Sequence, residues 1–231
     1  MKKQIRSITG IAGMLLAGAL PVAAGTVTYN YGDVSSGASP AGSPPWVQAI
    51  FSDTAPDTVQ LTLSAGNLTG NEFVSCWYFN LNPGMNPAGL TFAVSSTGGA
   101  FAGPTIKTGA DGYKAGPDGK FDLMLSFATG GDNSARFTSG DSITFDITGI
   151  SGLTADDFNQ LSTTAGGSGA YPSAAHIQDI PPDGGSGWVN PTATILSRST
   201  DQRVPDASTT IALLGTSLVA IQGLRRKLKV K

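Results

Sequence analysis

The chain has 231 residues, enough for one domain with a single hydrophobic core. With 31 glycines, 14 prolines and only 13% charged residues, the composition favours short strands joined by tight turns over long helices. Residues 25–203 contain fifteen acidic and six basic side chains, a net charge of −9, which argues against nucleic-acid binding because that requires a basic face.

The first 24 residues have the three parts of a secretory signal peptide. Residues 1–6 are basic, residues 8–20 are apolar and uncharged, and small residues follow up to Ala24. We expect signal peptidase to cleave after Ala24, and the export machinery to be a partner of the chain. An uncleaved anchor helix is the alternative, but its apolar part has thirteen residues, well short of the roughly 20 that cross a bilayer.

The body that follows shows repeated alternation of apolar and polar residues with a period of two. Such alternation indicates strands with one buried and one wetted face, and turn residues such as Gly130-Gly131 separate the segments. The predicted strands cover residues 26–31, 46–52, 59–63, 72–81, 90–95, 121–127, 143–147, 174–180 and 192–197.

One short helix is predicted over residues 154–162, where Thr154 caps the start and Asp157 follows three residues later. Many short strands with so little helix predict an all-β fold. We expect an antiparallel β-sandwich, jelly-roll-like, with a barrel as the alternative.

Three aspartates in a glycine-rich stretch are the candidate metal ligands. Asp111, Asp118 and Asp122 can offer the hard oxygen ligands that calcium prefers, although their spacing does not match an EF-hand. Asp-Gly is also a common hairpin turn, so a turn without calcium is the preferred interpretation and a calcium site is the alternative. No other cofactor is expected.

Two tryptophans are candidates for ligand binding. Trp46 and Trp188 lie beside proline and glycine, where an exposed ring can stack on a sugar, whereas Trp77 lies in a core-like strand. The single histidine, His176, has neither a nucleophile elbow nor a second histidine to support catalysis, and we expect a strand residue held by hydrogen bonds. Cys76, the single cysteine, is predicted to be a buried core residue. We therefore expect this protein not to be an enzyme.

The C-terminal segment predicts a membrane helix. Residues 209–224 are uncharged and would form about 24 Å of helix, against a hydrocarbon core of about 30 Å. Arg225, Arg226 and Lys227 follow as a basic stop on the cytoplasmic side, which places the acidic body outside. Apolar residues at helical spacing also suit an amphipathic surface helix, which is the alternative.

This tail resembles the PEP-CTERM class of sorting signals, and is most similar to the Val-Pro-Asp-Ser-Gly variant. Val204, Pro205 and Asp206 match the motif, whereas Ala207-Ser208 departs from its Ser-Gly. The resemblance implies recognition and removal of the tail by an exosortase, a membrane-embedded processing enzyme.

The expected organisation has five parts. A signal peptide (1–24) precedes the β-sandwich domain (25–198), a linker with the sorting motif (199–208), a transmembrane helix (209–224) and a basic stop (225–231). We expect an exported protein with a structural or interaction role, held in the inner membrane before processing and then located at the cell surface or in the extracellular matrix. An exported glycan- or calcium-binding module is the alternative, with extracellular polysaccharide as a partner.

Overall fold

Strands make up most of the part of the chain that the structure describes. The computed structural model describes residues 25–165 and 170–198. The strands are β1 (Gly25–Gly37), β2 (Val47–Ala55), β3 (Thr58–Ser64), β4 (Phe73–Phe79), β5 (Thr91–Gly98), β6 (Thr105–Lys114), β7 (Lys120–Ser126), β8 (Phe137–Thr138), β9 (Ser142–Thr148), β10 (Ser173–Ile180) and β11 (Gly185–Arg198), and the short 3₁₀ helices are η1 (Pro87–Gly89) and η2 (Ala155–Phe158).

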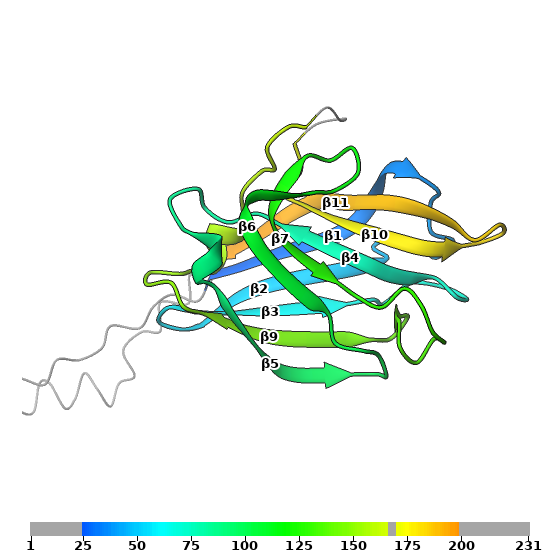
Figure 1. Ribbon diagram of the computed structural model, residues 1–231, viewed down its shortest axis with the longest axis horizontal. Coiled ribbons are helices and arrows are strands. Elements are labelled where there is room, and N and C mark those ends of the chain that lie inside the picture. The colour runs from blue at the N-terminus through cyan, green and yellow to red at the C-terminus, as the bar shows by residue number, and fades with distance from the viewer. Residues whose placement is uncertain (1–24, 166–169, 199–231) are drawn as a thin grey trace, which may run out of the picture. The chain divides into compact units, whose positions relative to one another are not determined.

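All of these strands belong to one antiparallel sheet. Its order is β5-β9-β3-β2-β1-β11-β10-β4-β7-β6, and β8 pairs with β4 off this path. Figure 1 shows β5, β9, β3 and β2 in succession, β11, β10 and β4 side by side, and β6 and β7 crossing obliquely over the first group in this view. The predicted all-β antiparallel class is confirmed. The two separate sheets of a sandwich are not observed, because β1 and β11 join the two halves continuously.

The two joining strands are long and bulged. β1 has 13 residues and β11 has 14, and the register between them shifts at three places, between Asn30 and Tyr31, between Tyr31 and Asp33, and between Val34 and Ser36. Each bulge bends a strand and increases its twist. The sheet can therefore curl so that one half packs on the other.

The predicted alternation decides which side chains enter the core. In β3 and β9 every second residue is buried, and the buried residues stand opposite one another in register. One such row crosses four strands and consists of Phe145, Leu61, Phe51 and Val27. Because the side-chain period of a strand is two, a slip of one residue would turn this row to solvent.

Aromatic rings join the two halves of the sheet. Phe51 of β2 lies 5.1 Å, centroid to centroid, from Phe79 of β4 in an edge-to-face arrangement, and stacks on Phe158 of η2 at 4.3 Å. Tyr31 of β1 meets Trp77 of β4 at 6.4 Å, and Trp77 is fully buried as the sequence predicted. These pairs add about 0.5–1.5 kcal/mol each to the gain from burying their area.

One predicted element differs from the structure, and two observed strands were not predicted. The helix predicted over 154–162 is a single 3₁₀ turn over Ala155–Phe158, where the Asp157 carboxylate accepts hydrogen bonds from the backbone N–H and the hydroxyl of Thr154 at 2.9 and 2.8 Å. β6 and the two-residue β8 were not predicted, because β6 contains Gly109 and Gly112, which weaken the strand pattern.

Candidate functional site

The stretch with the three candidate aspartates forms the β6–β7 hairpin. At its tip the Ala115 N–H donates to the Gly119 carbonyl at 3.1 Å, and the Asp118 N–H donates to the Ala115 carbonyl at 2.8 Å. Gly119 has a φ of +107°, which favours glycine. Asp118-Gly119 therefore lies in a turn, as one of the two alternatives predicted.

The fold separates Asp118 from the other two aspartates. The two carboxylate oxygens of Asp122 accept hydrogen bonds from the backbone N–H groups of Leu81 and Asp111, at 2.9 and 2.8 Å. Asp118 is buried elsewhere, against Ser35 and Asn190, and forms no ligand set with the other two. Across residues 25–165 and 170–198, no three His, Cys, Asp or Glu side chains are grouped to hold a metal ion.

Asp111 and Asp122 instead line a shallow pocket of about 240 Å³. Amide side chains complete its polar wall, and Asn80 is held there by a hydrogen bond to the Gln160 carbonyl at 3.1 Å. The exposed side chain of Leu161 adds an apolar wall. Since drug-sized ligands take about 300–1,000 Å³, this pocket suits a smaller polar group such as one sugar ring or a hydrated ion.

The two candidate tryptophans lie in different environments. Trp46 is only 5% exposed, and its indole N–H donates to the Gly42 carbonyl at 2.6 Å, so it offers no ring face to a sugar. Trp188 is partly buried and stacks on His176 with a centroid distance of 4.5 Å. Gly116 lies against the indole so closely that a Cβ there would come within 2.6 Å of it. Sugar stacking on Trp188 would therefore require this loop to move.

His176 is a strand residue held by a hydrogen bond, as predicted. Its Nδ1 lies 2.8 Å from the Ser75 hydroxyl, and burial lowers its pKa, which keeps the imidazole neutral at pH 7. Among the hydrogen bonds of the described residues it has no carboxylate partner, so a Ser-His-acid triad is not formed. Cys76 differs from the prediction: it is only partly buried, because it faces away from the main core.

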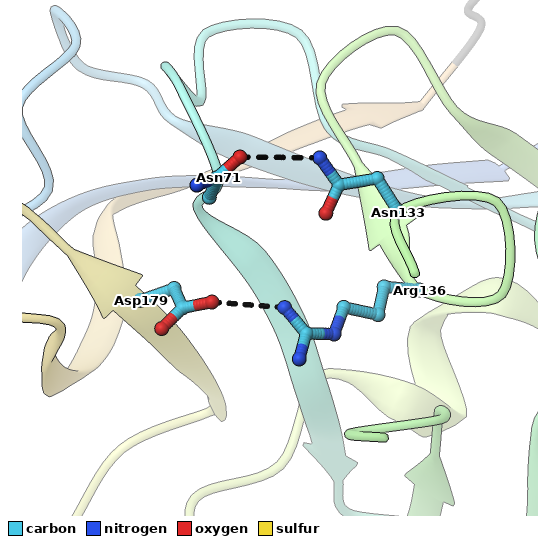
Figure 2. Close-up of polar contacts among 4 residues, drawn as sticks. All are labelled: Asn71, Asn133, Arg136 and Asp179. Carbon is cyan, nitrogen blue, oxygen red and sulfur yellow. Dashed lines mark hydrogen bonds and ion pairs between the residues drawn. The ribbon is translucent and has the colours of Figure 1, made fainter. Parts of the chain in front are cut away.

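Polar side-chain contacts that hold the 128–136 loop were not predicted. Figure 2 shows Arg136 reaching Asp179 at 2.8 Å and the Asn133 amide donating to the Asn71 side-chain oxygen, at 3.2 Å. The Arg136 guanidinium also lies 4.4 Å from the centre of the Phe73 ring, a cation–π contact. These contacts hold the loop against β4 and β10. The only sequence signal was that Arg136 is the single arginine between residues 7 and 197.

The predicted signal peptide (1–24) and the C-terminal segment 199–231 lie outside the described residues. These two segments contain the predicted site residues Ala24, Val204, Pro205, Asp206, Arg225, Arg226 and Lys227. In the part of the chain that the structure describes, no helix is long and apolar enough to span a membrane.

Comparison with known families identifies the tail. The model of the VPDSG-CTERM motif matches residues 203–228, so the chain carries a PEP-CTERM-type sorting tail, as the sequence predicted. No curated protein and no solved structure matches the chain. A tail of this class indicates an exported protein that passes through the membrane and is targeted to an exosortase-type enzyme.

Proposed function

We propose that this chain is an exported protein of the cell surface or extracellular matrix with a structural or interaction role and no catalytic activity. The observation that carries the proposal is the VPDSG-CTERM motif at residues 203–228. In this proposal the signal peptide (1–24) directs export, the helix (209–224) holds the chain in the membrane, and an exosortase-type enzyme cuts near Asp206.

The chemistry of the tail supports this order of events. Pro205 has no N–H and disfavours helix at Val204, so the chain at the motif stays extended and open to a processing enzyme. Asp206 then sits at the N-terminal end of the predicted helix, where a negative charge is favourable. The basic residues after position 224 and the acidic body before it favour the same orientation.

Deleting residues 203–231 tests the anchoring role of the tail. We expect the shortened protein still to be exported but to be soluble on the outer side of the inner membrane, without a membrane-bound precursor. Fractionation of the native host with detection of the body measures this, with the full chain as control. Retention of the shortened protein in the membrane fraction would show that another segment anchors it.

A second candidate role, binding of a glycan or calcium, is favoured by the pocket that Asp111 and Asp122 line. Carboxylate and amide oxygens there suit sugar hydroxyls or a hard cation. In this role we expect heat of binding when the protein is titrated with Ca²⁺ or an acidic polysaccharide.

Asp111→Asn should abolish that heat without disturbing the fold, because asparagine tolerates the left-handed backbone at this position, where φ is 48°. Asp183→Asn, in the exposed β10–β11 turn, is the matched control. Absence of heat and of any thermal shift with both ligands would remove this second role.

A further inference from the structure

Asp118 is a buried acid with hydrogen-bond partners on only one of its two carboxyl oxygens. It lies at the tip of the β6–β7 hairpin and is completely buried. Its Oδ2 accepts hydrogen bonds from the Ser35 hydroxyl at 3.0 Å and from the Asn190 amide at 3.1 Å, whereas its Oδ1 has no hydrogen-bond partner among the described residues.

The side-chain oxygen of Asn190, in β11, also lacks a hydrogen-bond donor. Its Nδ2 donates both hydrogens, one to Asp118 and one to the Ser173 carbonyl at 3.1 Å, while its buried Oδ1 has no hydrogen-bond partner in the part of the chain that the structure describes. Two adjacent side chains therefore each leave one acceptor unpaired. A buried acceptor without a donor destabilises the folded protein, because it has lost its hydrogen bonds to water.

One proton can satisfy both atoms. A carboxylic acid and a carboxamide are complementary, because the amide N–H donates to one carboxyl oxygen while the acid O–H donates to the amide oxygen. The Asn190-to-Asp118 hydrogen bond is the first half of such a pair, and a proton on Asp118 Oδ1 would supply the second.

Among the described residues, no charged group is hydrogen-bonded to the Asp118 carboxylate. Its carboxylate accepts from Ser35 of β1 and Asn190 of β11, and its backbone carbonyl accepts from the Ser162 hydroxyl; all three donors are neutral. The Tyr31 hydroxyl is hydrogen-bonded to Ser173, whose hydroxyl also donates to the backbone carbonyl of Tyr78. Both phenols stay neutral because burial raises the pKa values of Tyr31 and Tyr78. Burial also raises the pKa of Asp118, and the hydrogen bonds from Ser35 and Asn190 oppose this only in part.

We propose that Asp118 and Asn190 share one proton in a cyclic acid–amide pair, and that this pair is a pH-dependent latch fastening the 115–119 turn to β11. The proton comes from solvent and returns to it when Asp118 ionises. A carboxylate at this position would keep both acceptors unpaired and would have to be hydrated, so the turn must loosen.

The latch covers a second apolar cluster, separate from the main core. Its buried members are Tyr78, Ala115, Phe121 and Ala174, and Trp188 packs at its border. Since Gly116 of the same turn lies against the Trp188 indole, loosening of the turn exposes this tryptophan. The latch thus controls access to Trp188, which of the two candidate ligand tryptophans is the one that is only partly buried.

The direction of the pH effect follows from proton binding. Because the folded protein holds this proton more tightly than the unfolded chain, its contribution to stability is complete below the ordinary aspartate pKa of about 4. The contribution is lost as the pH rises from there through the pKa of Asp118 in the folded protein. Quenching of tryptophan fluorescence by acrylamide should increase over the same range.

Asp118→Asn in the full chain tests the proposal. The new amide can donate to Asn190 Oδ1 and accept from Ser35 and Asn190 without titrating. We expect the Tm of this variant at pH 8 to exceed that of the unaltered protein by about 2–4 °C. The loss of stability with rising pH that Asp118 causes in the unaltered protein should be absent from the variant. The carboxyl carbon signal of Asp118 in the unaltered protein should titrate with a midpoint above the ordinary value.

Asp141→Asn is the matched control. Asp141 is also buried, but its oxygens accept from the backbone N–H groups of Ala100 at 3.2 Å and Thr138 at 2.7 Å, so losing its charge should lower the Tm. The proposal is overturned if the Asp118 signal titrates at or below the ordinary value, or if Asp118→Asn lowers the Tm as Asp141→Asn does. A Tm raised by Ca²⁺ in the unaltered protein and not in Asp118→Asn would also overturn it, since a cation would then occupy the two oxygens.

Discussion

Replacing Phe51 with alanine should lower the free energy of unfolding by about 3–5 kcal/mol, the usual cost of truncating a buried phenylalanine. Phe51 is fully buried and meets rings from both halves of the sheet, Phe79 and Tyr29, as well as Phe158 of η2. Its loss would leave a cavity where the curled sheet closes on itself. Guanidinium denaturation of the full chain, followed by circular dichroism, measures the effect.

Val94→Ala is the control for this prediction. Val94 lies on the edge strand β5 and is 59% exposed, so its truncation should change stability by no more than about 0.5 kcal/mol. If Phe51→Ala cost as little as Val94→Ala, the two halves of the sheet would not share one core, and the fold described above would be wrong.

Changing Pro205 and Asp206 together to alanine should leave export intact but block release from the membrane. The double change removes two of the three residues that match the motif and lets the predicted helix extend toward the body. The protein should then accumulate as a membrane-bound form in the native host. Membrane fractionation together with mass spectrometry of the retained form checks this.

Ser208→Ala with Thr209→Ala is the matched control, since these neighbouring residues lie outside the Val-Pro-Asp tripeptide. Release of this control should continue at the normal rate. Normal release of the Pro205/Asp206 variant would instead mean that processing does not depend on the motif.

Much of the sheet follows from side-chain alternation. Val59, Leu61 and Leu63 alternate with polar residues and are fully buried in β3, and β7 and β9 follow the same rule. Alternation fixes which face of a strand is buried, but it does not identify the neighbouring strand. It therefore predicts an antiparallel all-β fold, and it does not distinguish two stacked sheets from one curled sheet.

β6 shows why some strands escape prediction. The stretch Thr108-Gly109-Ala110-Asp111-Gly112 has the composition of a turn, and its register with β7 is interrupted between Thr108 and Tyr113. The strand forms there because the paired edge of β7 supplies hydrogen-bond partners on both sides of the interruption. Such tertiary pairing overrides local propensity.

The candidate sites were harder to predict because proximity in sequence is a poor guide at a hairpin tip. Asp111 and Asp122 meet because β6 and β7 run antiparallel, whereas Asp118 at the turn packs inward on Asn190, 72 residues away. Trp46 follows two prolines and was expected at the surface, but its indole N–H donates a hydrogen bond to the carbonyl of Gly42, four residues earlier. Contacts of this kind depend on the completed fold.

The central claim is that this chain is exported and then processed at its C-terminal tail. Intact-mass measurement of the mature surface form from the native host tests it most directly. We predict a mass that lacks the residues beyond roughly position 206, consistent with removal of the matched tail. A mature form that retains the full-length C-terminus, ending at Lys231, would contradict the claim.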